Sequence, residues 1–283
     1  MENKGCTLKK SSVLTAGEVA AFRKEVRRHF QRQGRDLSWR RDRTPYRVFV
    51  SEIMLQQTQV GRVTEKFPFF LAVFTDFASL AAADTRRLLS VWKGMGYNRR
   101  ALSLRDAAKM IVKQFGGTLP AAPESLDTLP GVGKATAASI AVFAFNRPVA
   151  FIETNVRRVF IHRFFKDRTD VHDDEIMPLV ERTIDRKRPA AWYDALMDYG
   201  AALAKDVPNP NRRSSHYQRQ SPFAGSARQK RGAILGLLVG RTAMDREKIA
   251  RVLKIGRKQL LALLEGLERE GFIVGDAKKV RIR

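Results

Sequence analysis

Hydrophobic and polar residues follow one another with helical spacing along most of the chain. Residues 16–36 place apolar positions on one face and end near Gly34, and residues 45–74 repeat this spacing over two successive helices. Further helices are predicted at 84–94, 98–116, 123–129, 134–145, 155–165, 173–185 and 190–205. Strand-like alternation is nearly missing from this part of the sequence. The pattern therefore predicts a mainly α fold.

The helical pattern is interrupted between residues 205 and 230, where Pro, Asn, Ser and basic residues predict an irregular connection. It resumes as three shorter helices at 228–239, 245–253 and 257–271, followed by two short strands at 272–274 and 280–283. Three helices and a hairpin are typical of a winged helix, which is a helix-turn-helix variant. Residues 225–283 carry 15 Lys+Arg and 6 Asp+Glu, a net charge of +9, and we predict a winged-helix-like DNA-binding domain there. A basic helical cap without DNA contacts is the alternative.

The charge balance of the whole chain narrows the class of partner. The 283 residues include 53 Lys+Arg and 29 Asp+Glu, which gives a net charge of +24. Such an excess repels itself unless a polyanion neutralises it, and nucleic acid fits better than a membrane surface. The single cysteine, Cys6, excludes an internal disulfide, and the four histidines lack ligand spacing, so we expect no metal site. Without a secretory signal or a long apolar run, we expect a cytoplasmic, nucleoid-associated protein that does not enter membranes.

The stretch "LPGVGKATA" predicts a turn that opens onto a helix. Gly131 and Gly133 permit a tight backbone turn, and the N–H groups beyond them lie at the start of the helix from Lys134. A helix N-terminus with open donors and a positive dipole end binds a backbone phosphate. Lys134 adds a cation and Thr136 a hydroxyl group. With the preceding short helix, this is a helix-hairpin-helix that contacts DNA without reading its bases; a plain turn between helices is the alternative.

Two acidic residues occupy positions where a carboxyl group is expected to do chemistry. Glu52 lies in an apolar and amide-rich helix, where burial raises a carboxyl pKa and favours a general acid. Glu153 precedes the helix at 155–165, and a helix N-terminus favours the ionised carboxylate. One neutral acid and one carboxylate is the pairing that cleaves glycosidic bonds through an oxocarbenium-like state. A solvated Glu52 at a helix edge and a simple N-cap at Glu153 are the alternatives.

Five stretches in this order resemble a known family: residues 34–60, 91–109, 129–140, 153–159 and 195–201. Together they are similar to MutY-type adenine DNA glycosylases, which belong with endonuclease III to the helix-hairpin-helix (HhH-GPD) glycosylase superfamily. The similarity spans about Phe22 to Ala204. It implies a two-lobed glycosylase core over residues 1–224, with lobe A at about 44–150 and lobe B at about 1–43 plus 151–224. DNA would lie between the lobes with the target nucleotide flipped out.

The resemblance also implies roles for single residues. Glu52 matches the acid that protonates adenine, and Glu153 stands where the family has an aspartate that stabilises the cationic sugar. Gln57 matches the amide that wedges into the base stack, and Tyr97 lies in the segment that probes the strand beside the orphan base. Ala135 occupies the position of the Schiff-base lysine of endonuclease III, which implies base removal without β-elimination. The full set of expected DNA contacts is Gln57, Thr58, Tyr97, Gly131, Gly133, Lys134, Thr136, Asn155 and Arg157.

The sequence departs from the family at the residues that would bind an iron–sulfur cluster and in its C-terminal part. The four cluster cysteines should fall at Ala204, Asn211, Ser214 and Gln220, so no iron–sulfur cluster is expected. The nearby basic residues Arg212, Arg213 and Arg219 are expected to touch the DNA backbone instead. The resemblance leaves room for a monovalent cation at the hairpin carbonyls near Leu129 and Val132. The winged-helix pattern stands where the family has a domain that reads 8-oxoguanine.

These inferences predict a monofunctional DNA glycosylase of base excision repair. The expected reaction is hydrolysis of the N-glycosidic bond of a mispaired base, first of all adenine opposite 8-oxoguanine or guanine. A glycosylase for thymine or uracil in G mismatches, or for an alkylated base, is one alternative. A DNA-binding protein whose active site has drifted is another. The expected partner is double-stranded DNA with a flipped nucleotide, bound by a monomer.

Overall fold

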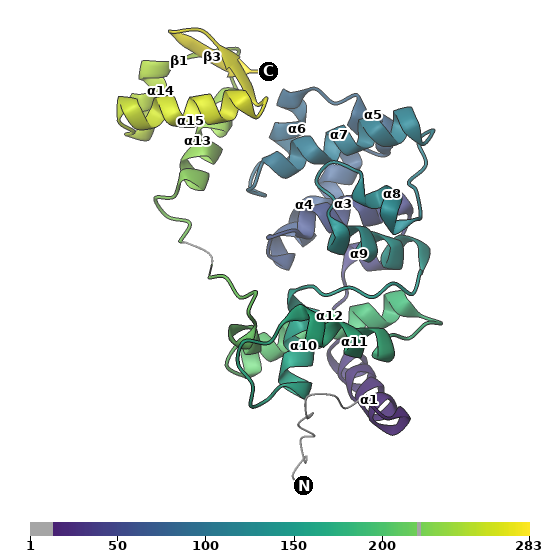
Figure 1. The fold of residues 1–283 in the computed structure, drawn as a ribbon. Coiled ribbons are helices and arrows are strands. Elements are labelled where there is room, and N and C mark those ends of the chain that lie inside the picture. The colour runs from purple at the N-terminus through teal and green to yellow at the C-terminus, as the bar shows by residue number, and fades with distance from the viewer. Residues whose placement is uncertain (1–13, 220–221) are drawn as a thin grey trace. The chain divides into compact units, whose positions relative to one another are not determined.

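The computed structural model describes residues 14–219 and 222–283, and most of these lie in helices (Figure 1). The predicted mainly α fold is confirmed. The chain divides into two compact units. Unit 1 comprises Met1–Val48, Ala121–Asp127 and Gly133–Arg219, and unit 2 comprises Phe49–Pro120, Thr128–Val132 and Gln220–Arg283. Helix α3 (Pro45–Leu55) begins in unit 1 and continues into unit 2.

Unit 1 is a helical unit built around aromatic side chains. Its helices are α1 (Ala16–Gln33), α2 (Ser38–Arg41), α8 (Pro123–Asp127), α9 (Lys134–Phe145), α10 (Thr154–Phe164), α11 (Asp173–Thr183), α12 (Pro189–Asp206) and the 3₁₀ helix η1 (Pro210–Arg213). Phe22 of α1 meets the rings of Phe160, Phe164 and Trp192 edge-on, at centroid distances of 5.4, 5.2 and 5.8 Å. Such edge-to-face pairs stabilise a core beyond the area they bury. They join α1, α10 and α12 into one packed layer.

The first part of unit 2 contains most of α3 and four further helices. These are α4 (Val60–Val73), α5 (Phe77–Ala81), α6 (Thr85–Val91) and α7 (Arg99–Gln114). Asp76 and Asp84 accept hydrogen bonds from backbone N–H groups at the starts of α5 and α6, which fixes where these short helices begin. Phe70 of α4 packs edge-on against the buried Trp92, at a centroid distance of 5.9 Å.

The second part of unit 2, residues 222–283, is here called the C-terminal segment. It contains α13 (Ala227–Val239), β1 (Met244–Asp245), α14 (Arg246–Leu253), α15 (Arg257–Arg269), β2 (Ile273–Gly275) and β3 (Lys279–Ile282). The strands form an antiparallel sheet in the order β1-β3-β2, with Val274 opposite Arg281. The three helices and the hairpin occur where the sequence predicts them. Strand β1 was not predicted, because two residues carry no readable alternation.

The two units differ from the lobes expected from the sequence. Helix α9 was expected with residues 44–150 but belongs to unit 1, because its apolar surface packs on α12 and places Ala138, Val142 and Phe143 in that core. The C-terminal segment is grouped with unit 2, where α13 packs on α6, and its status as a separate domain stays a prediction. In both cases contacts distant in sequence decide the grouping, and helical periodicity does not report them.

The connection after α12 is more ordered than its composition predicts. Helix η1 begins at Pro210, and Asn211 and Ser214 are buried. Ser214 lies in a bridge with Val171, whose N–H donates to the carbonyl oxygen of Arg213 at 2.8 Å. The prediction of an irregular connection over 205–230 therefore holds only in part. Among the described residues, no helix combines the length and the apolar character needed to cross a membrane.

Candidate active site

Glu153 in unit 1 is the N-cap of α10. Its Oε1 atom accepts hydrogen bonds from the backbone N–H groups of Asn155 and Val156 at 2.7 and 2.9 Å. Its Oε2 atom lies 3.3 Å from the Asn155 side-chain amide. The N-cap interpretation of Glu153 is thus correct for its structural role. A carboxylate held by three donors is also fixed in direction, which is what a reacting group requires.

The protonation of Glu153 differs from the expectation for a helix N-terminus. Burial raises the pKa of its carboxyl group, and the N–H groups of Val156 and Asn155 oppose this, as do the charges of Arg158 and Arg157. Burial outweighs these opposing effects, so the pKa lies above the ordinary value of 4.5. The N–H groups at the start of α10 lower the pKa, as expected for a helix N-terminus, and burial adds an opposing effect that the sequence does not reveal.

Two arginines surround Glu153 and are themselves held in place. Arg158 is buried, and its Nη1 atom donates to Asn155 Oδ1 and to the carbonyl oxygen of Gly200, both at 2.7 Å. A side chain at Gly200 would meet the Asn155 carbonyl oxygen at 2.4 Å, so only glycine lets α12 approach α10 this closely. Arg157 forms a paired contact with Asp173 at 2.7 and 2.6 Å. The predicted DNA contacts Asn155 and Arg157 thus have partners inside unit 1.

Glu52 lies on α3, in the part of that helix that belongs to unit 2. The side chain is half-buried, between the buried residues Ser51 and Ile53. This exposure lies between the two interpretations of the sequence, a desolvated acid and a solvated residue at a helix edge. Partial burial leaves a side that a ligand can reach while removing part of the water around the carboxyl group.

Gln57 and Thr58 follow α3 in a turn held by Arg100, a residue that sequence reasoning missed. Gln57 is exposed and has a positive φ of 51°. Arg100 Nη1 donates to the carbonyl oxygens of Ile53 and Met54, both at 2.9 Å, and of Gln56 at 2.5 Å. Its Nη2 atom donates to Thr58 Oγ1 at 2.8 Å. This one guanidinium fixes the loop that presents Gln57.

Arg100 also holds the turn that carries Tyr97. Its Nη2 atom donates to the carbonyl oxygens of Met95 and Gly96, both at 3.2 Å. The guanidinium lies 5.6 Å from the centre of the Tyr97 ring. Tyr97 has a φ of 44°, which is uncommon for a residue with a side chain and is often found at functional sites. Arg100 thus brings the two predicted DNA-contacting turns together within unit 2.

The glycines of the hairpin have different local requirements. Gly131 has a φ of 81°, and a side chain there would meet Cβ of Ser103 at 2.7 Å, so glycine is needed. A side chain at Gly133 would meet open space. Gly133 is the N-cap of α9 and has no side chain that could cover the first N–H groups of that helix. Lys134 is exposed and Thr136 is half-buried in the first turn.

The four positions expected for cluster cysteines do not fit an iron–sulfur cluster. The sequence has one cysteine, Cys6, which lies outside the described residues, and such clusters are held by thiolates. Asn211 donates from Nδ2 to the carbonyl oxygen of Thr154 at 3.0 Å, next to Glu153. Gln220 also lies outside the described residues. Within the ranges described, no group of three or more His, Cys, Asp or Glu side chains could hold a metal ion.

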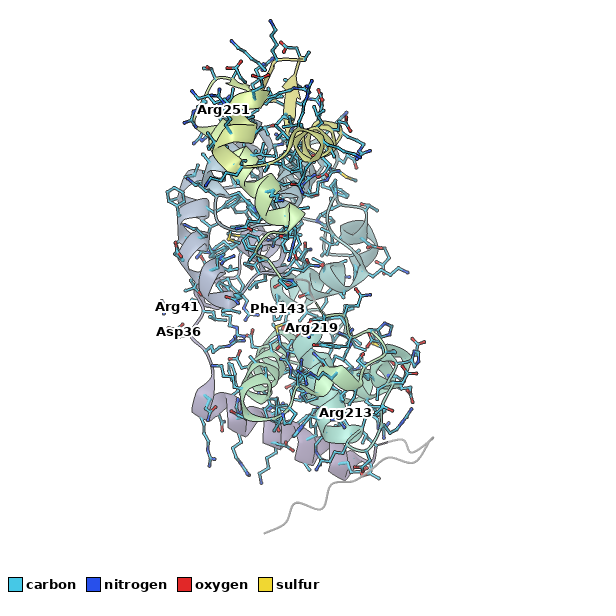
Figure 2. The ribbon with its side chains drawn as sticks, turned by 90° about the vertical axis from the view of Figure 1, so that its left-hand side faces the viewer. Asp36, Arg41, Phe143, Arg213, Arg219 and Arg251 are labelled. Carbon is cyan, nitrogen blue, oxygen red and sulfur yellow. The ribbon has the colours of Figure 1, made fainter. Side chains whose placement is uncertain are left out.

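Arg213 has partners inside unit 1. Its Nη1 atom donates to the carbonyl oxygen of Phe165 at 2.6 Å and to that of Lys166. These bonds hold the turn after α10, and contact between Arg213 and the DNA backbone stays a prediction. Arg212 is exposed, as is Arg219, which Figure 2 labels, and backbone contact by both stays a prediction.

Sequence reasoning also missed a cluster in which two acids on α12 bind arginines from the segment before α3. Asp198 is buried and accepts from the backbone N–H of Arg35 at 2.7 Å and from Arg40 Nη1 and Nη2 at 2.9 and 2.8 Å. Asp194, one turn earlier, pairs with Arg40 at 2.9 Å and with Arg43. Two acids spaced by four residues in an apolar helix are a signal that could have been read. They anchor the segment before α3 to the helix that packs on α10.

Comparisons with known proteins identify the relatives of this chain. Residues 50–185 match the HhH-GPD superfamily of base excision DNA repair proteins. The chain is 32% identical over 233 residues to the adenine DNA glycosylase of Mus musculus, covering 78% of this chain and 44% of that protein. It is 30% identical over 221 residues to the adenine DNA glycosylase of Mycolicibacterium smegmatis, covering 72% of this chain and 75% of that protein. The chain therefore spans less than half the length of the mouse relative and three quarters of the bacterial one.

Two solved structures share the fold. A thermostable thymine-DNA glycosylase superposes with a TM-score of 0.58 at 24% identity, covering 66% of this chain and 87% of that one. Endonuclease III in a non-covalent DNA complex superposes with a TM-score of 0.56 at 19% identity, covering 76% and 92%. The fold, the ordered motifs and the sequence identity lead to the same assignment. The chain belongs to the HhH-GPD superfamily of base excision repair proteins and, within it, to the family of adenine DNA glycosylases.

Proposed function

We propose that this protein is a monofunctional DNA glycosylase that removes adenine mispaired with 8-oxoguanine or guanine. The observation that carries the proposal is Glu153, a half-buried carboxyl group held by three donors at the start of α10, in a chain that belongs to the adenine DNA glycosylase family. An N-cap needs no such burial. A group that must stabilise a cationic sugar gains from it, because charges attract more strongly where water is displaced.

The proposed reaction assigns one step to each acid. Glu52 gives a proton to the adenine ring, and the bond between the sugar C1′ and the base nitrogen breaks with its electron pair leaving on adenine. The carboxylate of Glu153 stabilises the oxocarbenium ion that remains. A water molecule adds at C1′ and loses a proton, which leaves an abasic site. Ala135 is exposed on α9 and carries no amine, so no Schiff base forms with this residue.

Double-stranded DNA is the proposed partner, and several features support it. The net charge of +24 favours a polyanion. The N-terminus of α9 offers uncapped donors beside the exposed Lys134, which suits one backbone phosphate. Gln57 and Tyr97 are presented by two turns that Arg100 joins, which suits insertion beside a flipped nucleotide. We also propose that the carbonyl groups near Leu129 and Val132 bind a monovalent cation, which would stabilise the hairpin.

The C-terminal segment supports a second zone of backbone contact. Helix α14, the turn after it and the start of α15 carry exposed basic residues, namely Lys248, Arg251, Lys254, Arg257 and Lys258. Figure 2 labels Arg251 among them. In a helix-turn-helix the second helix and the turn before it face the duplex. We propose that this winged-helix-like surface adds affinity without defining the excised base, and that the protein acts on DNA as a monomer.

A substrate panel tests the activity. Duplexes with adenine opposite 8-oxoguanine or guanine, thymine or uracil opposite guanine, and an alkylated base are incubated with the protein and then cleaved at abasic sites by alkali. We expect strand breaks first at adenine. Product only from another duplex would replace adenine as the substrate. No product from any duplex, together with tight and salt-sensitive binding, would support the drifted DNA-binding protein instead.

A single substitution tests the assignment of the acid. Glu52→Gln should lower the rate of adenine release by about 10²–10⁴-fold, the usual contribution of a general acid. Duplex binding should change by less than about twofold, since the amide keeps the shape of the side chain. Glu124→Gln on the exposed surface of α8 is the matched control and should leave both values unchanged. Equal losses of binding and rate in Glu52→Gln would contradict its role as the acid.

A further inference from the structure

The C-terminal segment is held against α6 by an arginine at the end of α13. Arg86 of α6 donates from Nη1 to the carbonyl oxygens of Leu238 and Val239, both at 2.9 Å, and to that of Arg241. These groups lie at and just beyond the C-terminal end of α13, where the last carbonyl groups of a helix lack partners within it. A cation at this position also faces the negative end of the helix dipole. Arg86 therefore fastens α13 to α6, on which it packs.

A second arginine makes the same kind of contact with α15. Arg99, the first residue of α7, donates to the carbonyl oxygen of Glu270 at 3.1 Å, and Glu270 is the C-cap of α15. The Glu270 carboxylate is paired with Arg231 of α13 at 2.7 Å, so the two helices are also joined to each other. The contacts made by Arg86 and Arg99 are here called the latch. They hold two helices of the C-terminal segment by their C-terminal ends.

The opposite end of α15 belongs to a positive surface. Residues 246–258 cover α14, the turn after it and the start of α15, and they include six Lys or Arg residues and one acidic residue, Glu247. Five of the basic side chains are exposed and are here called the α14–α15 surface, with one of them labelled in Figure 2: Lys248, Arg251, Lys254, Arg257 and Lys258. Among the described residues, none of these five side chains has a hydrogen-bond or ion-pair partner. Their charge is therefore available to a polyanion.

The latch fixes how far this surface lies from a predicted DNA contact. Helix α15 has 13 residues, which gives a length of about 20 Å at about 1.5 Å per residue. Its C-terminal end lies beside Arg99, which follows Tyr97 closely in sequence, so its positive start lies about 20 Å from that contact. Along a duplex this distance corresponds to roughly six base pairs. In a helix-turn-helix, the start of the second helix is the part that reaches the duplex.

We propose that the latch makes the α14–α15 surface a fixed extension of the DNA-binding surface of unit 2, and that this surface binds phosphates of the same duplex on one side of the mismatch. Positive side chains without internal partners suit phosphates, and such contacts do not read sequence. A surface that is already held in place binds the flanking duplex without a separate loss of freedom, so it adds more affinity than a loosely tethered module. The inference rests on the proposed function, because the mismatch determines where unit 2 lies on the duplex.

Shortened duplexes locate the contact without catalysis. Three duplexes carry a tetrahydrofuran abasic analogue opposite guanine, with both flanks long or with one flank cut to about five base pairs, which is shorter than the reach of α15. Dissociation constants are measured by fluorescence anisotropy over a series of salt concentrations. Cutting one flank should weaken binding about tenfold, and cutting the other should change it by less than about twofold. The duplex that loses affinity identifies the side that the surface binds.

Substitutions in the surface should act through that flank. Arg251→Ala combined with Arg257→Ala removes two phosphate contacts, so the salt dependence of log Kd on the uncut duplex should become shallower by about two. On the duplex that lacks the flank, the same pair should change this slope by less than about half a unit. Arg62→Ala combined with Lys113→Ala removes two exposed charges from α4 and α7 and is the matched control. It should leave the difference between the duplexes as it is in the wild type.

The latch is tested by substitutions that leave the α14–α15 surface intact. Arg86→Met combined with Arg99→Met removes both contacts, and the loss on cutting the sensitive flank should shrink from about tenfold to about threefold or less. Arg62→Met combined with Lys113→Met removes the same charge and should keep the full loss. Circular dichroism and melting curves show that each variant is folded.

The possible results separate this inference from the glycosylase proposal, because adenine release is measured in parallel on a duplex with adenine opposite 8-oxoguanine. A wild-type chain that releases adenine but binds all three duplexes equally would overturn the inference and leave the proposed function intact. So would a flank dependence that survives in the Arg251 and Arg257 pair or in the latch pair, or two duplexes bound per chain. A chain that releases no adenine would overturn the proposed function and the inference with it.

Discussion

Arg158 in unit 1 and Arg100 in unit 2 each organise a predicted contact region, but by different electrostatics. Burial lowers the pKa of both guanidinium groups, that of Arg100 to about 10. The charge of Glu153 raises the pKa of Arg158 back toward its ordinary value. Arg100 instead donates to carbonyl oxygens and to the Thr58 hydroxyl group. One arginine is balanced by a carboxylate, and the other is held by neutral dipoles.

This difference fits the two tasks proposed for the regions. The Glu153 carboxylate lies beside the positive charge of Arg158, and it can still attract the positive charge that develops on the sugar. A turn that must approach phosphates gains from an arginine whose charge is not cancelled by an acid beside it. The region of Glu153 is thus suited to a cationic reaction centre. The region of Arg100 is suited to a polyanion.

The largest expected effect concerns the ion pairs that support the Glu153 region. Asp198→Ala leaves Arg35 and Arg40 without the carboxylate that they share, and breaking a buried pair costs about 3–5 kcal/mol of unfolding free energy. Asp36→Ala is the control, because Asp36 and Arg41 form an exposed pair and its loss should leave stability unchanged (Figure 2). Denaturant unfolding of both variants measures the difference. Equal stability of the two would show that the buried cluster does not support α12.

The next largest effect concerns Arg100, whose guanidinium group donates to backbone carbonyl oxygens. Arg100→Met removes the donor shared by the carbonyl groups of two turns, and unpaired buried acceptors should cost about 2–3 kcal/mol. Duplex affinity should also fall, because Gln57 and Tyr97 lose their fixed positions. Arg62→Met, on the exposed surface of α4, is the control for charge alone. Stability and affinity that match those of Arg62→Met would mean that Arg100 is only another positive charge.

A smaller effect is expected at the two hairpin glycines, where one substitution should lower stability and the other DNA affinity. Gly131→Ala places a side chain against Cβ of Ser103 at a positive φ and should destabilise the fold by about 1–2 kcal/mol. Gly133→Ala adds a methyl group in open space, so its melting temperature should match the wild type while DNA affinity falls. Affinity loss without stability loss at Gly133 is what a phosphate site predicts. Unchanged affinity there would favour a plain turn.

The smallest effect is a shift in pH dependence. Because burial raises the pKa of Glu153, adenine release should fall on acidification at a pH above the ordinary carboxyl range. Arg158→Met removes a charge that lowers this pKa, so the acidic limb should move to higher pH, whereas Arg100→Met should not move it. Rates of the folded variants between pH 4 and 8 test this. An acidic limb that moves equally in both variants would contradict the comparison.

The same pKa has a consequence for stability. A raised carboxyl pKa means that the folded chain binds the proton more tightly than the unfolded chain. The contribution of Glu153 to stability is therefore higher at low pH and falls as the pH rises through the raised pKa. Glu153→Gln removes this penalty and should raise the melting temperature at pH 8, with the difference shrinking toward pH 4. A lower melting temperature at pH 8 would mean that the N-cap bonds outweigh the burial of charge.

Most of the helices could be predicted from the sequence. Apolar spacing and terminal glycines or polar caps define α9, α10 and α15 to within a few residues, because these signals are local. The glycine turn before α9 was also predicted, since Gly131 has the positive φ that only glycine adopts easily.

The remaining features depend on contacts between distant segments. Arg100 meets the carbonyl groups of residues 44 to 47 positions earlier, and Asp198 meets Arg35 and Arg40, which lie about 160 positions earlier. Nothing in the local pattern distinguishes such side chains from solvated ones. The raised pKa of Glu153 was not predicted for the same reason, because burial is a property of the packed unit.

The central claim, that Glu52 and Glu153 act on the same nucleotide, is tested most directly by a double-mutant cycle. Single-turnover rates of adenine release are measured for Glu52→Gln, Glu153→Gln and the double variant on a duplex with adenine opposite 8-oxoguanine. If the two acids act as a unit, each single variant loses about 10²–10⁴-fold and the double variant loses little more than the worse single one. Losses that multiply in the double variant, or a single variant that keeps the wild-type rate, would contradict the account.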